Sequence, residues 1–312
     1  VALAAGFADK IGTGDEWGEH VAQLAGEDEW DESPGAFAHT SLDAWLAHTA
    51  PEPSSGGFGS DKGQIGIITV SGEISDTDVG PGSAGAARIT RLLDNALNDD
   101  LAELVVRLDT PGGTVTGSEA IRRSILNYKN KEIPVIVSMG NYAASGGYWI
   151  ATTGDQIFAE PETLTGSIGI ILAIPTFEDL LAEYGVNAEQ IGVTPLSGQP
   201  DILGGFSPET EQLLQLETAA IYDRFLNLVS SSRSVTTQRA DELAQGRVWT
   251  GGSARQLGLV DQFGNLDNAI AYAAGQAGLE EGEYSPRYLS EPIDPFDAML
   301  AGMAGNAAQP PQ

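Results

Sequence analysis

Short apolar runs alternate with amphipathic segments along most of the chain. Residues 64–70 (QIGIITV), 104–108 (LVVRL) and 134–138 (PVIVS) are continuous apolar runs of strand length, which is typical of strands buried on both faces. Residues 85–98 and 118–129 place apolar side chains at helical spacing. Because strands and helices alternate, the sequence predicts an α/β fold with a mostly parallel sheet and covering helices.

The rest of the chain carries weaker signals. We expect short strands at 156–159 and 168–171, and helices at 145–152, 177–184, 208–230, 237–244, 253–257 and 265–277. Residues 49–63 are rich in Pro, Gly and Ser, which indicates a linker. The prolines after Gly282 predict little regular structure there. The predicted organisation is a helical segment at 1–48, a linker at 49–63, a main domain at 64–281 and a tail at 282–312.

One internal similarity bears on this organisation. Residues 2–26 and 254–278 match without a gap at a shift of 252 positions, in pairs that include Gly6/Gly258, Asp9/Asp261, Gly12/Gly264 and Asp15/Asp267. Chance similarity between two Ala/Gly-rich helices is the alternative, but the ordered core of the match favours duplication. If the match is a duplication, segment 1–48 is the end of a first repeat, and we expect the earlier part of that repeat to be missing from this chain.

Composition excludes several classes of function. The net charge is -29 with a pI of about 4.1, which repels nucleic acid. The chain has no cysteine, so thiol nucleophiles and Cys-based zinc sites are excluded. No stretch reaches the roughly 20 apolar residues of a membrane-spanning helix. The chain starts with Val1 and shows no leader, so we expect any anchor to lie outside it.

Two glycine-rich segments follow predicted strands, at the strand ends where ligand crevices form in parallel sheets. In DTPGGTVT (109–116), Gly112 and Gly113 permit a tight turn that exposes N–H groups. Such donors hold the oxyanion of an acyl-transfer intermediate. An ordinary Pro-Gly turn is the alternative.

Ser145 lies in the second segment, NYAASGGYWIA (141–151), at a predicted strand-to-helix turn. Small neighbours, Ala144 and Gly146, leave room for a substrate carbonyl at Oγ, and the N–H groups of the helix start point to the same place. The arrangement resembles a nucleophile elbow, although Ala143 replaces the first Gly of the G-x-S-x-G pattern. Simple helix capping is the alternative.

A serine nucleophile needs a base. The histidines precede the first strong strand and are expected to face solvent: His20, His39 and His48. A lysine kept neutral by burial is the next candidate. None of the lysines lies in an apolar, Gly-flanked setting: Lys10, Lys62, Lys129 and Lys131. We therefore expect the chain alone to lack its base. Ser167 in TGSIG (165–169) is expected to bond such a base or to close a turn.

The segments DTPGG, AASGGYWIA and TGSIG, followed by QGRVWTGGSARQLGLVDQFG (245–264), resemble the signal peptide peptidase A family over roughly 64–278. The resemblance implies a Clp protease and crotonase-like fold of stacked ββα units. It also implies that the chain takes part in hydrolysing hydrophobic membrane-derived peptides, such as cleaved signal peptides. This chemistry needs no metal and no organic cofactor.

By the same resemblance, Ser145 is the nucleophile, the N–H groups of Gly113 and Gly146 are the oxyanion donors, and Ser167 orients the base. In the family's short form the lysine follows TGSIG, but the matching stretch at 196–203 (LSGQPDIL) has none. In the long, duplicated form the lysine belongs to the first repeat. We therefore expect a lysine-bearing N-terminal half of the same protein as a partner.

Substrate contacts, assembly and location are further expectations. Gly112, Met139 and Tyr142 are candidate substrate-binding residues. Ile171 could also line a substrate groove, and core packing is the alternative for Met139, Tyr142 and Ile171. The family resemblance implies a homo-oligomeric ring, with a tetramer expected, and the helix at 208–230 is a candidate subunit contact or simply core. It also implies a bacterial inner-membrane location with the catalytic part facing the periplasm.

Two other functions remain open at this point. A crotonase-type acyl-CoA hydratase or hydrolase could share the fold and the oxyanion hole, but it would use acidic catalytic residues and would not need Ser145. A non-catalytic scaffold or binding module is the alternative from a different class, because a fragment without its base behaves that way by default.

Overall fold

A computed structural model of the chain describes residues 5–6, 9–10, 12–28, 33, 35–40, 45, 63–78, 82–186, 188, 192–194 and 196–290. The chain divides into two compact units, Val1–Ser60 with Pro292–Gln312, and Asp61–Glu291. The predicted linker, apart from Gly63, and the tail from 291 onwards lie outside the described residues. In the first unit, helix α1 (Gly14–Ala25) starts at a capping box formed by Thr13 and Glu16.

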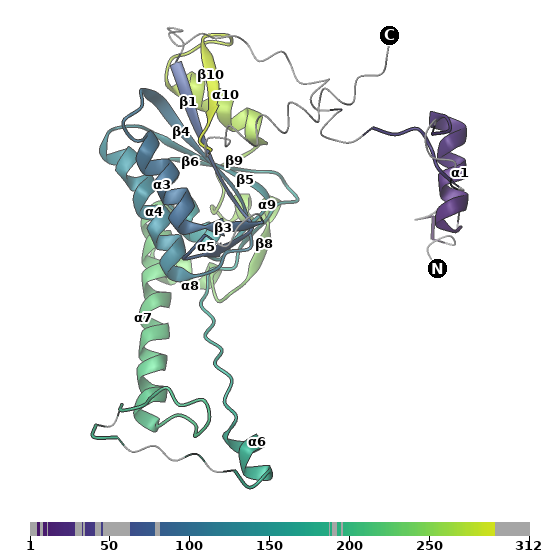
Figure 1. Cartoon of the computed structure of the whole chain (residues 1–312). Coiled ribbons are helices and arrows are strands. Elements are labelled where there is room, and N and C mark those ends of the chain that lie inside the picture. The colour runs from purple at the N-terminus through teal and green to yellow at the C-terminus, as the bar shows by residue number, and fades with distance from the viewer. Residues whose placement is uncertain are drawn as a thin grey trace. The chain divides into compact units, whose positions relative to one another are not determined.

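The second unit is built on one mostly parallel sheet (Figure 1). Its main strands lie in the order β10-β1-β4-β5-β6-β9, and β7 pairs in parallel with β5 and antiparallel with β8. The strands are β1 (Gly63–Ser71), β4 (Leu101–Thr110), β5 (Val135–Ala144), β6 (Gln156–Ala159), β7 (Leu164–Gly166), β8 (Val248–Thr250), β9 (Gln262–Phe263) and β10 (Tyr284–Tyr288). A separate parallel pair consists of β2 (Glu73–Ser75) and β3 (Ser83–Gly85).

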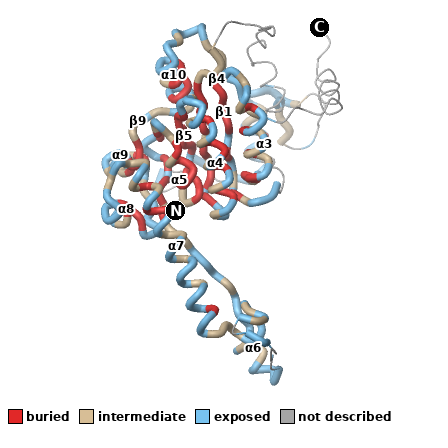
Figure 2. Tube along the Cα trace, turned by 90° about the vertical axis from the view of Figure 1, so that its left-hand side faces the viewer, coloured by how far each residue is buried: buried red, intermediate tan, exposed pale blue. Residues whose placement is uncertain are grey.

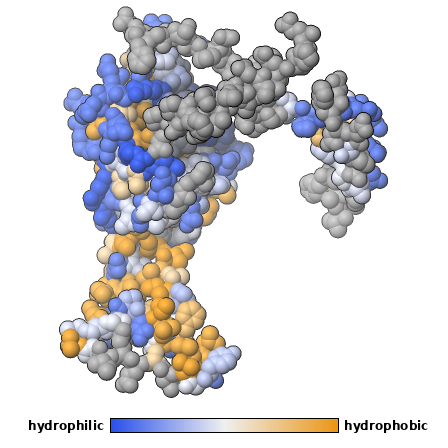
Figure 3. Space-filling model, in the orientation of Figure 1, coloured by the Kyte–Doolittle hydropathy of each residue, from blue (hydrophilic) through white to orange (hydrophobic). Residues whose placement is uncertain are grey.

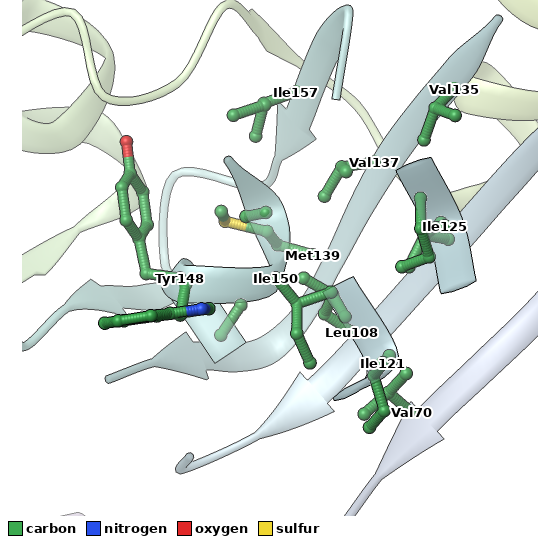
Figure 4. Packing of buried hydrophobic residues seen from close by; sticks show 14 of the residues in the cluster. Val70, Leu108, Ile121, Ile125, Val135, Val137, Met139, Tyr148, Ile150 and Ile157 are labelled. Atoms are coloured by element: carbon green, nitrogen blue, oxygen red, sulfur yellow. The ribbon is translucent and has the colours of Figure 1, made fainter. Parts of the chain in front are cut away.

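Helices cover both faces of this sheet, as predicted for the α/β class. The helices of this unit are α3 (Ala86–Ala96), α4 (Val115–Asn130), α5 (Gly146–Ala151), α6 (Glu178–Glu183), α7 (Pro208–Arg233), α8 (Thr237–Leu243), α9 (Gly251–Gln256) and α10 (Leu266–Gln276). Along β4, Leu104 and Val106 belong to the core beneath α3, α4 and α5, whereas Val105 belongs to the core beneath α10. Figure 4 shows the first of these cores, where Ile121 of α4 packs among strand residues.

The N-terminal half of α7 and the segment before it project from the sheet body (Figures 1 and 2). Of the 26 residues of α7, the buried ones are Thr210 near its start and Phe225, Leu226 and Val229 near its end. The helix is therefore anchored to the core mainly through its C-terminal turns. No helix within the described residues combines the length and the apolar character needed to cross a membrane.

Two sequence predictions about regular structure are wrong. Residues 168–171 form no strand, because the backbone leaves the sheet after β7 and Ile171 is 92% exposed. The segment after Gly282 is not irregular at its start, because β10 pairs in parallel with β1 from Gly63↔Tyr284 to Ile67↔Tyr288. Pro286 is tolerated there because β10 is the outermost strand.

Glu103 of β4 makes the stability of this fold depend on pH. Its side chain is buried and neither carboxylate oxygen has a hydrogen-bond partner among the described residues. Burial, assisted by the nearby charge of Asp155, raises the pKa of Glu103 from 4.5 to about 7. The folded state therefore holds the proton more tightly than the unfolded state does. That stabilisation is complete below pH 4.5 and is lost as the pH rises to about 7.

We expect Glu103→Gln to remove this pH dependence, since the neutral amide carries no titrating charge. The wild-type chain should lose at most about 3 kcal/mol of unfolding free energy between pH 4.5 and 8 because of this group. Urea unfolding at pH 5 and pH 8 measures the difference. Glu162→Gln, at an exposed turn position, is the control. An unchanged pH slope in Glu103→Gln would contradict the assignment.

Candidate functional site

Ser145 occupies a strained turn between β5 and α5. Its φ of 51° and ψ of -116° lie outside the regions that a non-glycine residue prefers, and such strain costs on the order of 1–3 kcal/mol. The turn is held on both sides: Ser145 N–H donates to Gly166 O at 2.9 Å, and Ser145 O accepts from Trp149 N at 2.9 Å. A half-buried hydroxyl thus stands at the start of a helix.

The Gly112–Gly113 turn lies directly against this serine. A Cβ on Gly112 would lie 2.7 Å from Gly146 N and 2.8 Å from Ser145 Cβ. Gly112 and Gly113 both adopt positive φ. A Cβ on Gly113 would overlap the backbone of Ile74. No residue with a side chain fits here without displacing the backbone, which explains why two glycines follow Pro111.

Two backbone N–H groups are available beside Ser145. The bonds between the Ile74 strand and the turn use Ile74 N, Gly112 O and Thr114 N, and leave Gly113 N–H without an acceptor in the described part of the chain. Gly146 is the first residue of α5, so its N–H also has no acceptor within the helix. This pair is suited to binding an oxyanion.

Polar side chains fix the turn from outside. The Thr110 hydroxyl accepts the N–H of Gly112 at 3.1 Å. Thr114 and Thr116 donate to Asp76 at 2.9 and 2.6 Å. These hydroxyl bonds, the one from Thr116 first, lower the pKa of Asp76 below its ordinary value. The PGG turn is therefore bonded to both β4 and the loop after β2.

Ser167 reaches the same place through the pairing of β7 with β5. Ala144 is in register with Gly166, so Ser167 follows β7 as Ser145 follows β5. Ser167 also has a positive φ, of 48°, and its N–H donates to Arg247 O at 2.7 Å. The structure thus brings Ser145, Ser167 and the two glycine amides to one edge of the sheet.

These residues form the floor of a cavity of about 980 Å³. Gly113, Ser145, Gly146 and Ser167 line it on one side. Two walls enclose the rest of the cavity, one formed by α7 and one by the irregular segment after β7. Residues of these two walls are Leu214, Gln215, Thr218, Ala219, Ile221, Tyr222 and Phe225 of α7, and Gly169, Ile170, Ile171 and Leu172. The cavity is therefore polar at its floor and largely apolar along its walls.

Three residues predicted as substrate contacts, Gly112, Met139 and Tyr142, do not line the cavity. Met139 does not line a groove: it is 1% exposed and packs in the core (Figure 4), because β5 is a central strand covered on both faces. Tyr142 is exposed but is not part of the cavity lining. Gly112 lies behind Gly146 and supports the turn without lining the cavity.

Sequence reasoning missed the α7 wall and Trp149 as parts of the site. The spacing of Leu214, Thr218, Ile221 and Phe225 places them along one face of a helix, but the same spacing describes a helix packed against a core. Only the exposed irregular segment opposite shows that this face borders a cavity.

The two described lysines of the second unit, Lys129 and Lys131, have partners away from this cavity. Lys129 Nζ lies 2.6 Å from Asp155 Oδ1 and donates to Thr153 O. Lys131 Nζ donates to Leu97 O and Asn98. Neither lines the cavity, so no described lysine of the second unit reaches Ser145 through this space.

Comparisons with known proteins agree with this geometry. A model of peptidase family S49 matches residues 127–280. Protease 4 of Salmonella typhi is 39% identical over 245 residues, which cover 78% of this chain and 39% of that protein. A putative protease of Synechocystis is 32% identical over 253 residues, 79% of this chain and 88% of that protein. A putative signal peptide peptidase of Enterococcus faecium is 35% identical over 167 residues, 54% of this chain and 48% of that protein.

The chain thus spans about two fifths of the length of Protease 4 but most of the length of the Synechocystis relative. The relatives are named as proteases and not as crotonase-type hydratases, and the likeness agrees with the Clp protease-like fold. The chain belongs to peptidase family S49.

Proposed function

We propose that this chain supplies the nucleophile of a serine–lysine peptidase, with Ser145 attacking the scissile carbonyl. The observation that carries the proposal is a serine at positive φ beside two unpaired glycine N–H groups, on the floor of an apolar-walled cavity. In the acyl-transfer intermediate, the N–H groups of Gly113 and Gly146 bind the oxyanion.

The reaction proceeds in two steps. A neutral lysine takes the proton of Ser145 Oγ, the Oγ–C bond forms, and the C–N bond of the peptide breaks as the lysine returns the proton to the leaving amine. Water then attacks the acyl-serine ester, releasing the carboxylic acid and restoring the hydroxyl. Ser167 holds the lysine in place during both steps.

The lysine comes from an N-terminal half of the same protein. The relation between α1 and α10 supports this proposal: Thr13 and Asn265, separated by the same 252 positions as the sequence match, both close capping boxes at the start of their helices. Residues 1–48 then correspond to the end of a first repeat, and the lysine lies earlier in that repeat.

The substrates proposed are hydrophobic peptides derived from membranes, such as cleaved signal peptides. Apolar side chains along the walls favour them, because they remove apolar peptide surface from water. The relative in Enterococcus faecium is named a putative signal peptide peptidase, and the same substrate class is proposed for this chain. A location at the bacterial inner membrane, with the site facing the periplasm, belongs to this proposal.

Further copies of the chain are the proposed partners, assembled in a ring that we expect to be a tetramer. The projecting arm, defined as residues 170–186, 196–206 and the first half of α7, exposes large apolar side chains (Figure 3). Among them, Ile171 is 92% exposed and Tyr184 is 78% exposed. Contiguous apolar surface of this kind marks an interaction site.

Ser145→Ala should abolish peptide hydrolysis when the chain is assayed together with the lysine-bearing half. The fold should persist, because alanine fits the same turn. Cleavage of a fluorogenic hydrophobic peptide measures the loss, and Ser285→Ala on β10, away from the cavity, is the control. Turnover at the wild-type rate would refute the nucleophile assignment.

Gly146→Ala should lower kcat by roughly 10²–10³-fold, the usual effect of losing one oxyanion donor. The added methyl would overlap the Ser118 hydroxyl and displace the start of α5. Gly275→Ala is a matched control, since Gly275 is also helical but has nothing within 4 Å of the added methyl. Steady-state kinetics separate kcat from KM. A Gly146→Ala enzyme with unchanged kcat would show that this N–H does not bind the oxyanion.

A further inference from the structure

One carboxylate joins the three helices around the cavity. Glu119 of α4 is 12% exposed and accepts hydrogen bonds from Trp149 Nε1 of α5 at 2.9 Å and from Arg224 of α7 at 2.6 Å. Arg123, one turn along α4, donates to it at 2.9 Å, and Arg122 lies 3.7 Å away. Glu119 and the Trp149 side chain that it binds thus connect α4, α5 and α7.

Both partners of Glu119 on the other helices belong to the cavity walls or adjoin them. Trp149 lines the cavity, and its ring packs against Phe225 with centroids 4.9 Å apart. The guanidinium of Arg224 lies 5.8 Å from the centre of the Trp149 ring. The backbone N–H of Trp149 also donates to Ser145 O, so the same residue contacts the turn of Ser145 and the α7 anchor.

The position of the α7 wall depends on this anchor. The wall residues run from Leu214 to Phe225, about 16 Å of helix at 1.5 Å per residue. Most of this length precedes the buried turns of α7. A small tilt at Arg224 is therefore enlarged towards Leu214 and changes the width of the cavity.

Charge explains why Glu119 matters at this place. Three guanidinium groups surround one carboxylate. Burial alone would raise the pKa of Glu119, but hydrogen bonds from Trp149 and Arg123 and the charges of Arg122 and Arg224 outweigh it, so the pKa is lowered. Without the carboxylate, three like charges would face one another in a partly buried space.

We infer that Glu119 is a positioning residue that sets the width of the peptide-binding cavity by fixing Trp149 and the α7 wall through its bonds to Trp149 and Arg224. The inference rests on the proposed function, since it names a determinant of peptide binding at the same site. It adds no catalytic step.

Peptide binding to the Ser145→Ala form of the chain tests the inference without requiring the lysine. The probe is a fluorescein-labelled peptide of eight Leu and Ala residues, followed by fluorescence anisotropy. Glu119→Gln should weaken binding about tenfold or more, because removing one partner of a buried charge cluster is strongly unfavourable. Sodium chloride at 0.5 M should restore part of the lost affinity, since it screens the remaining guanidinium groups from one another.

Three further variants make the test specific. Arg224→Gln should also weaken binding, and the double variant should be no weaker than Glu119→Gln alone, because both act through one bond. Asp99→Asn is the matched control, since Asp99 pairs with Arg287 at 2.7 Å on β10, away from the cavity. Circular dichroism confirms that each variant is folded. If Glu119→Gln does not fold, the loss of peptide affinity in Arg224→Gln decides: weaker binding supports the positioning role, and unchanged binding overturns it.

The outcomes separate this inference from the proposed function. Tight binding by Ser145→Ala with equal binding by the Glu119→Gln and Arg224→Gln forms would overturn the positioning role and leave the peptidase proposal intact. Weakening in the Asp99→Asn control as well would show a general loss of stability and would also overturn the positioning role. No binding by any form would overturn the proposed peptide cavity itself.

Discussion

The site depends on a backbone turn that its own sequence does not favour. Ser145 is held at positive φ because β5 delivers it between Gly166 O and the Gly112–Gly113 turn. The surrounding sheet offsets the strain: β5 lies between β4 and β6, with its first residues fully buried. The hydroxyl is thereby held beside the glycine amides, whereas a relaxed turn would rotate it away from them.

The sequence predicted the floor of the site better than its walls. The floor follows from local rules: a strand, a small residue, a serine and two glycines can form few structures, and the PGG turn needs glycine for the same reason. The strands β4 and β5 were predicted from continuous apolar runs. By contrast, 168–171 has the apolar character of a strand but forms no strand in the described structure, and Ile171 instead borders the cavity.

Met139 illustrates why pattern alone cannot assign a substrate contact. It lies close in sequence to Ser145, but a central strand with both faces covered buries every side chain along its first half. Trp149 was expected only as a helix residue, and its role at the cavity follows from a carboxylate far away in sequence, Glu119. β10 was missed because its pairing with β1 joins residues more than two hundred positions apart.

The floor and the wall of the cavity are stabilised by different means. The floor is fixed by backbone hydrogen bonds and by the absence of Cβ atoms, so it tolerates almost no substitution but also has almost no freedom. The wall is one long helix with an apolar anchor at one end and an exposed arm at the other. A rigid floor facing a helix that is anchored at its C-terminal turns keeps the geometry around Ser145 fixed while leaving the width of the cavity adjustable. Under the proposed function, the hydrolysis of apolar peptides of varied shape, this division places the variable part where a change costs least catalytic power.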